Sequence, residues 1–294
     1  MDAAPGAPTA PRTHEPGDLP ESTRCSLRTS SWRSGADFTR SANIGLPGRP
    51  VVLFIVFLAA SLAARPAAAM HLAEGVLPLA WCAVWNALAL PFVAIALHLL
   101  RQRTQQDAFY KPFVGLVAAA VFAISCMPVP VPTAGTCSHP CGTGLAAVLI
   151  GPWMTVLVTV VALLIQALFL AHGGLTTLGA DVASMGIAGA FTGYLAFRLA
   201  RRCGANLWVA GFLAGVTSDW ATYATTALEL ALGLAGEGSV TSMFTAVALA
   251  FVPTQLPLGL LEGAMTAGAL VFLRSRRPDI LERLRVVPLA AGAS

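Results

Sequence analysis

The sequence predicts an all-α integral membrane protein with six or seven transmembrane helices. Of the 294 residues, 56% are hydrophobic and only 11% are charged, and the mean hydropathy is +0.72. The apolar residues also form long continuous runs, whereas strands of a membrane barrel alternate apolar and polar residues over about 10 positions. Because a helix satisfies its backbone hydrogen bonds internally, such runs cross a bilayer as helices.

The first 69 residues have the features of a leader. Residues 1–50 are rich in Pro, Ser, Thr, Gly and Arg and lack apolar periodicity, so we expect them to be disordered or to precede the true translation start. Residues 51–69 hold an apolar run of about 14 residues followed by Ala67 and Ala69, which is typical of a signal peptide and its cleavage site. Cleavage would leave a chain that begins at Met70, and an uncleaved signal anchor is the alternative.

Six apolar runs follow within a predicted transmembrane domain at residues 70–275. These runs are 79–100, 113–131, 145–171, 182–199, 207–234 and 241–273. Arginines cluster after the first, fourth and sixth runs, which predicts that these ends are cytoplasmic. The mature N-terminus is then outside, and residues 276–294 form a cytoplasmic tail.

An outside start and an inside end require an odd number of crossings, so one run must contain a further segment. The region between Pro132 and Asp181 is the expected place, because Gly151 and Pro152 break its long apolar run. Irregular backbone at membrane depth is tolerated where protein buries it. We therefore expect this region to fold back into the bundle.

The charged residues argue against two classes of function. Basic residues lie in short clusters between apolar runs and form no patch with exposed aromatic residues, so no nucleic-acid partner is expected. The sequence also lacks a G-x-x-x-x-G-K-[ST] phosphate loop, so ATP hydrolysis is not expected on this chain. A membrane enzyme that uses the Cys-His loop would lack a recognisable base or cofactor motif.

Two outer segments carry candidate metal ligands. In a chain that begins at Met70, the terminal amine, the backbone nitrogen of His71 and the His71 imidazole can close two fused chelate rings. His139 lies in the loop TAGTCSHPCGTGL at 133–145 and can supply a fourth nitrogen. A planar nitrogen site favours Ni(II) or Cu(II) and is compatible with low-spin Co(II), so this geometry selects a class of metal and not one metal.

The cysteines that flank His139 leave other chemistry open. Cys137 and Cys141 can form a disulfide in an oxidising compartment. As thiolates they could instead hold a soft metal together with His139. The sequence does not decide between these states.

Four acidic residues fall within apolar runs, where a charged group costs several kcal/mol and is seldom retained without a function. They are Asp181, Asp219, Glu229 and Glu262. For Asp219 and Glu262, interhelical hydrogen bonding and ion handling are both consistent with the sequence.

Several segments resemble a known transporter family. They are MHLAEGVLP at 70–78, GTCSHPCGTGL at 135–145, LIGPW at 149–153, LAHGGLTTLGA at 170–180, DWATY at 219–223 and TQLPLGLLEG at 254–263. They resemble the CbiM/NikM family, the substrate-capture (S) components of cobalt and nickel energy-coupling-factor importers, and the cobalt branch most. The likeness extends from Met70 to about Leu273, and the Met-His start together with SHP is its most specific part.

This resemblance implies a seven-helix bundle with an external N-terminus. It implies that Met70, His71 and His139 bind Co(II), or Ni(II), as the transported substrate, without an organic cofactor. The residues expected to support these ligands are Glu74, Thr136, Ser138, His172 and Asp181. Cys141 and Asp181 stand where the family usually has threonine and asparagine, so its affinity and selectivity do not carry over directly.

The resemblance also implies partners: a transmembrane coupling subunit, ATPase subunits and a small accessory membrane subunit in the cell inner membrane. Metal captured outside would be delivered inside by tilting of the lipid-embedded bundle and would feed cobalamin synthesis. The alternative is a stand-alone secondary transporter or channel for a divalent transition-metal cation. Its ionisable path would need Asp181, Asp219 and Glu262, and transport without an ATPase partner would favour it.

Overall fold

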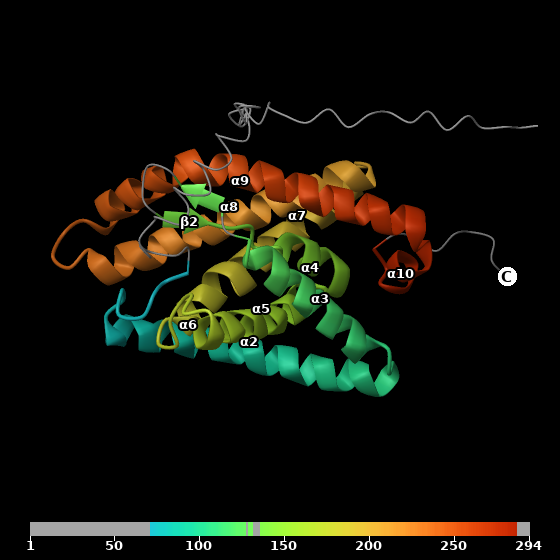
Figure 1. Ribbon diagram of the computed structural model, residues 1–294, viewed down its shortest axis with the longest axis horizontal. Coiled ribbons are helices and arrows are strands. Elements are labelled where there is room, and N and C mark those ends of the chain that lie inside the picture. Colours follow the sequence, from blue (N-terminus) through green and yellow to red (C-terminus); the bar gives the residue numbers. More distant parts are fainter. Residues whose placement is uncertain (1–70, 128, 132–135, 287–294) are drawn as a thin grey trace, which may run out of the picture. The chain divides into compact units, whose positions relative to one another are not determined.

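The computed structural model describes residues 71–127, 129–131 and 136–286, and the predicted leader, signal segment and Met70 lie outside this part. The described part is a bundle of helices with one two-stranded ribbon (Figure 1). The helices are α2 (Leu79–Gln106), α3 (Tyr110–Ser125), α4 (Thr143–Ile150), α5 (Pro152–Phe169), α6 (Leu178–Asp181), the π-helix η1 (Val182–Gly189), α7 (Ala190–Arg202), α8 (Leu207–Leu234), α9 (Val240–Arg276) and α10 (Pro278–Arg283).

Among the described residues, four helical segments are long and apolar enough to cross a membrane: α2, α5, the continuous segment from α6 to α7, and α9. The apolar helix α3 is shorter, with 16 residues, and α8 has 28 residues but carries Ser, Thr, Asp and Glu side chains. Leu79, Leu116 and Phe272 are 75%, 66% and 62% exposed. Such exposure suits side chains that face lipid, and the predicted all-α membrane fold is confirmed.

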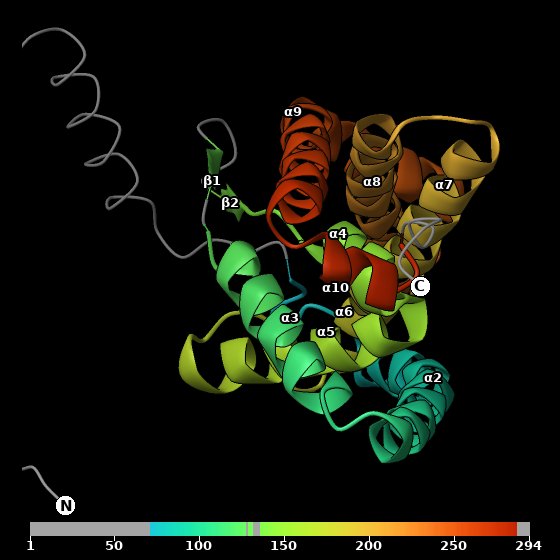
Figure 2. The ribbon, with the colours of Figure 1, turned by 90° about the vertical axis from the view of Figure 1, so that its right-hand side faces the viewer.

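The predicted break in the run 145–171 is also present. Gly151 has a φ of +84°, which a glycine adopts without strain, and it separates α4 from α5. With eight residues, α4 is about 12 Å long and too short to cross a bilayer alone. Seven of its residues are buried. It packs against α3, α5, α7, α8 and α9, and lies in the middle of the bundle in the end-on view (Figure 2).

The prediction that residues 113–131 form one transmembrane segment was wrong at its C-terminal end. Helix α3 stops at Ser125, and Val129–Val131 form strand β1 instead. This strand pairs antiparallel with β2 (Thr136–Ser138), with Val129 opposite Ser138. The cause is the alternating prolines of this segment, because proline lacks an amide hydrogen and disfavours helix at the residue before it. The ribbon leads directly into His139.

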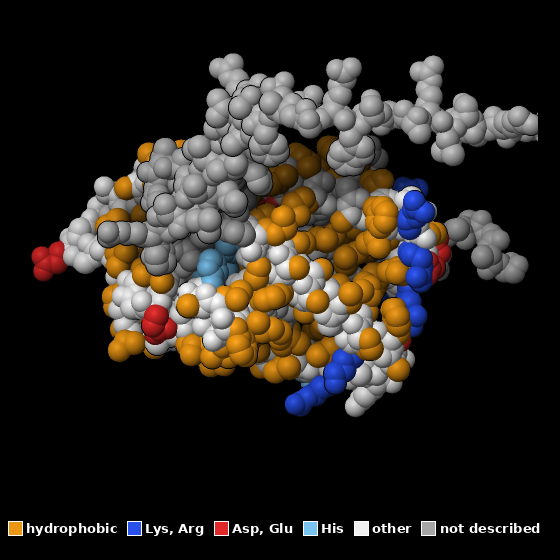
Figure 3. Space-filling model, in the orientation of Figure 1, with side chains coloured by type: hydrophobic (Ala, Val, Ile, Leu, Met, Phe, Trp, Pro, Cys, Tyr) orange, Lys and Arg blue, Asp and Glu red, His pale blue; other side chains and the backbone are white. Residues whose placement is uncertain are grey.

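Lysine and arginine side chains gather at one end of the bundle (Figure 3). Helices α2, α7 and α9 each carry basic residues in their last turn. At this end Arg283 of α10 pairs with Asp107, which follows α2, at 2.8 Å. The concentration of positive charge at one end is what the positive-inside rule expects of a cytoplasmic face.

Helices α8 and α9 pack closely where Gly215 meets α9. A Cβ atom on Gly215 would lie 2.6 Å from the Glu262 carbonyl oxygen and 2.7 Å from Gly263 Cα, and neither backbone atom can move aside easily. We expect Gly215→Ala to destabilise the fold by about 1–3 kcal/mol through overpacking, measured as a lower midpoint of thermal unfolding in detergent.

The matched control for this change in α8 is Gly268→Ala, a glycine substitution within α9. A Cβ atom there meets nothing within 4 Å, and alanine favours helix over glycine. The midpoint of Gly268→Ala should not fall. Equal losses in the two variants would contradict the close packing of α8 on α9.

Candidate metal-binding site

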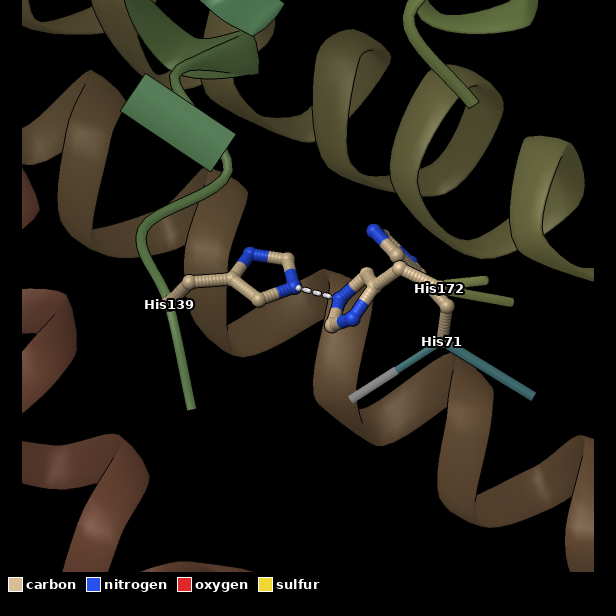
Figure 4. A group of neighbouring side chains, drawn as sticks. All are labelled: His71, His139 and His172. Atoms are coloured by element: carbon tan, nitrogen blue, oxygen red, sulfur yellow. Dashed lines mark hydrogen bonds between the residues drawn. The ribbon is translucent and has the colours of Figure 1, made fainter. Parts of the chain in front are cut away.

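Three histidines from three separate segments meet at one place (Figure 4). His71 precedes α2, His139 follows β2, and His172 lies between α5 and α6. The ring centroids of His71 and His139 are 4.7 Å apart, and each lies 5.0 Å from that of His172. One nitrogen from each ring lies within 4.8 Å of the other two.

The Nε2 atoms of His139 and His172 are 3.0 Å apart. This distance suits a hydrogen bond in which one ring donates and the other accepts. It also suits two neighbouring ligands of one metal, because nitrogens about 2.1 Å from a metal and at a right angle lie about 3.0 Å apart. The 3.0 Å spacing is therefore compatible with a hydrogen bond between the two rings and with two ligands of one metal.

Burial keeps the three imidazoles neutral. His71 and His139 are only 3% and 1% exposed. Burial, and then the neighbouring His139 and His172, hold the pKa of His71 well below 6.5. Burial, and then His172, lower the pKa of His139 to about 3, and burial also lowers the pKa of His172. Each ring at pH 7 thus has an unprotonated nitrogen that can bind a metal.

One of these nitrogens has no partner in the part of the chain that the structure describes. Nε2 of His71 is buried and makes no hydrogen bond there. Leaving a buried polar atom unpaired costs about 1–3 kcal/mol. A ligand at this place would remove that cost.

Asp181 and Thr177 hold the chain next to His71. The Leu72 N–H donates to Asp181 Oδ1 at 2.8 Å, and the Thr177 hydroxyl donates to the Leu72 carbonyl oxygen. The same Asp181 oxygen is 3.9 Å from His71 Nδ1, which is longer than a hydrogen bond. Asp181 therefore fixes the backbone beside the imidazole and does not bond to the ring.

Glu74 binds the loop that carries His172. Its carboxylate accepts hydrogen bonds from the Thr176 N–H and hydroxyl, which lower the pKa of Glu74. Two glycines permit this contact: a Cβ on Gly174 would lie 2.7 Å from Glu74 Oε2, and a Cβ on Gly173 would lie 3.2 Å from His71 Cβ. The sequence LAHGGLTT thus brings the loop of the third histidine against the segment of the first.

Ser138 ties the end of β2 to two long helices. Its hydroxyl is 2.9 Å from the Tyr223 hydroxyl of α8 and accepts a hydrogen bond from Gln255 Nε2 of α9 at 2.7 Å. These contacts fix the backbone directly before the histidine of this loop. The side chain of Thr136 and the whole of Met70 lie outside the described part, so their predicted contributions stay predictions.

Comparison with known proteins identifies the family of this chain. The family model of the cobalt uptake substrate-specific transmembrane region, CbiM, matches residues 71–280. The chain belongs to the CbiM family. As a CbiM-family protein it is a multi-pass membrane protein of cobalt uptake, and the resemblance noted in its motifs is confirmed.

Relatives of this CbiM-family chain include the cobalt transport protein CbiM of Sorangium cellulosum, 92% identical over 225 residues, which are 76% of this chain and 100% of the relative. The cobalt transport protein CbiM of Geobacter sulfurreducens is 60% identical over 230 residues, covering 78% of this chain and 66% of the relative. A solved truncated transition metal transporter has a TM-score of 0.62 at 27% identity, covering 70% of this chain and 99% of that one.

Sequence reasoning placed His172 among the supporting residues and did not foresee that its ring lies in the cluster itself. In sequence, 33 residues separate it from His139, and no ligand spacing links them. The available signal was the Gly173-Gly174 pair, which allows tight packing against another segment. The Cys137 side chain lies outside the described part, so the disulfide between Cys137 and Cys141 stays a prediction. Cys141 is buried.

Proposed function

We propose that this chain is the substrate-capture subunit of an energy-coupling-factor importer, and that it binds Co(II), or Ni(II), outside the membrane to supply cobalt for cobalamin biosynthesis. The observation that carries the proposal is the meeting of three imidazoles from separate segments, two of them buried and the third, His172, half-buried. Neutral nitrogen donors suit these divalent metals. The family's role in cobalt uptake supports the same cargo.

The proposed ligands are the amine of Met70, the backbone nitrogen and imidazole of His71, and the imidazole of His139. This set requires that the leader be removed so that the chain begins at Met70. His172 would position His139 through the 3.0 Å contact between their Nε2 atoms.

The proposed orientation puts the histidine site outside and the basic end of the bundle in the cytoplasm of a cell with this protein in its inner membrane. ATP would be hydrolysed by separate ATPase subunits, and a coupling subunit would tilt the bundle to deliver the metal. A small accessory membrane subunit completes the proposed complex. Cobalt uptake by cells that make this chain without those partners would contradict the proposal and favour a stand-alone transporter.

The decisive experiment is native intact mass spectrometry of the protein purified from membranes, before and after addition of Co(II) and Ni(II). The expected mass is that of a chain beginning at Met70, with a metal ion at the histidine site whose mass is lost in His139→Ala. An uncleaved leader on a chain that still binds metal through His139 would exclude the amine as a ligand.

Metal affinity should depend on pH in a way that reports the amine. Between pH 7 and 6 the proposed imidazole ligands add little dependence, because burial holds the pKa of His71 well below 6.5 and lowers the pKa of His139 to about 3, so both stay neutral. An α-amine has an ordinary pKa of about 7.7–8.0 and must lose its proton to bind metal. The dissociation constant for Co(II), measured by calorimetry, should therefore rise at least about tenfold per pH unit as the pH falls. A flat profile would mean that imidazoles bind without the amine.

A further inference from the structure

A second group of possible metal ligands includes Cys141, two residues after His139. Cys141, Asp219 and Glu262 each offer one atom, and these atoms lie within 4.8 Å of one another. All three residues are buried, with exposures of 0%, 0% and 1%. They come from the segment before α4, from α8 and from α9.

The side chain of Asp219 is buried without a hydrogen-bond partner among the described residues. Both of its carboxylate oxygens are buried, and neither accepts a hydrogen bond from any residue that the structure describes. Burying a carboxylate with no donor and no countercharge is expensive. A cation between Asp219 and its two neighbours would compensate both oxygens.

Glu262 is held in place by the backbone and can still bind a cation. Its Oε2 accepts from the Cys141 N–H at 2.7 Å, and its Oε1 accepts from the Gly142 N–H at 3.0 Å. Because each carboxylate oxygen has two lone pairs, one hydrogen bond leaves room for a metal. These bonds fix the carboxylate beside the cysteine and make the group preorganised.

Two members of the cluster, Asp219 and Glu262, lie within long helices, whereas the histidine site is made by connecting segments. Asp219 is 12 residues, about 18 Å, from the first residue of α8, and Glu262 is 14 residues, about 21 Å, from the last residue of α9. The first residue of α8 and the last residue of α9 both lie at the basic end of the bundle. The cluster is therefore well inside the bundle when measured from this basic end. Ionisable groups at such depth usually belong to ion pathways.

We propose that Cys141, Asp219 and Glu262 form a second cation site that binds a divalent transition metal through one thiolate and two carboxylates. A mixed sulfur and oxygen set suits Co(II) or Zn(II) in tetrahedral coordination and differs from a planar nitrogen site. The inference rests on the proposed function, because the metal in this site is cargo that has left the histidines on its way inward.

The test uses the full-length protein in detergent with a reductant, and Co(II) alone as the probe. Coordination of Co(II) by a thiolate produces a sulfur-to-metal charge-transfer absorption band. The unaltered protein should bind two Co(II) ions and show this band. Cys141→Ser and Asp219→Asn, which hardly change side-chain size, should each weaken the second ion's binding more than tenfold and remove the band at stoichiometric Co(II).

Two further variants separate the sites. His139→Ala should lose one Co(II) and keep the band, and Cys137→Ser should keep both ions and the band. Retention of the His139-dependent ion by Cys141→Ser and Asp219→Asn shows that these variants are folded.

Each other outcome overturns one idea. If the protein binds a single Co(II) that is lost in His139→Ala and never shows the band, the second site is excluded. The proposed function is unaffected by that outcome. A band that survives Asp219→Asn but is lost in Cys137→Ser assigns the thiolate to a Cys137, His139 and Cys141 site instead. A band with no His139-dependent ion would support the second site and defeat the proposed histidine site.

Discussion

Insertion of two alanines between Met70 and His71 is expected to weaken Co(II) binding at the histidine site by about ten-thousandfold. The insertion moves the amine out of the fused chelate rings and so removes two of four proposed nitrogen ligands. If four ligands together supply about 10–16 kcal/mol, each is worth about 3 kcal/mol, and two are worth about four decades of affinity. Calorimetry in the Cys141→Ser background would report this site alone.

Two residues are needed because one would create a different chelator. A chain that begins Met-Ala-His could wrap its amine, two amide nitrogens and imidazole around Ni(II) or Cu(II) by itself. The matched control is the same two alanines inserted after Glu237, which is exposed in the connection between α8 and α9. That insertion should leave affinity unchanged, and unchanged affinity in both variants would show that the amine is no ligand.

His139→Ala is expected to weaken Co(II) binding at the same site by about a hundredfold or more, because it removes one ligand worth about 3 kcal/mol. The control is His98→Ala, since His98 is exposed on α2, where its ring contacts Gln102. Affinity should be unaffected there. Calorimetry of the two variants in the Cys141→Ser background provides the comparison.

The same measurement on His172→Ala separates support from ligation. Loss of a residue that only positions a ligand typically costs about 10–100-fold in metal affinity, so we expect a smaller loss than for His139→Ala. A loss equal to that of His139→Ala would make His172 a ligand. The 3.0 Å contact between their Nε2 atoms is compatible with either role.

The sequence was a good guide to the fold wherever hydrophobicity and backbone chemistry point the same way. The break at Gly151 and Pro152 could be predicted because those residues impose it within an apolar run. The end of α3 could not be found from hydropathy, because Met127, Val129 and Val131 are as apolar as a helix requires. There the prolines decide, through hydrogen bonds that the backbone cannot make.

The histidine cluster could be predicted only in part. The proposal for His71 and His139 came from the chemistry of a free N-terminus and a small-residue loop, and the structure brings their rings together. The approach of His172 depends on packing between α5, α6 and the segment before α2, which no local pattern encodes. Likewise, Asp219 and Glu262 stood out as acidic residues in apolar runs, but their meeting with Cys141 depends on the close packing of α8 on α9.

Glu262 also connects α9 to the segment that follows His139. Its carboxylate grips the N–H groups of Cys141 and Gly142, directly after the histidine loop, while the last turn of its helix carries Arg274 and Arg276. Hydrogen bonds to a charged group are worth about 1.5–3 kcal/mol each. A displacement of α9 must therefore either move the segment that follows His139 or break both hydrogen bonds to Glu262. A partner that displaces the basic end of α9 is therefore expected to move the proposed histidine site as well.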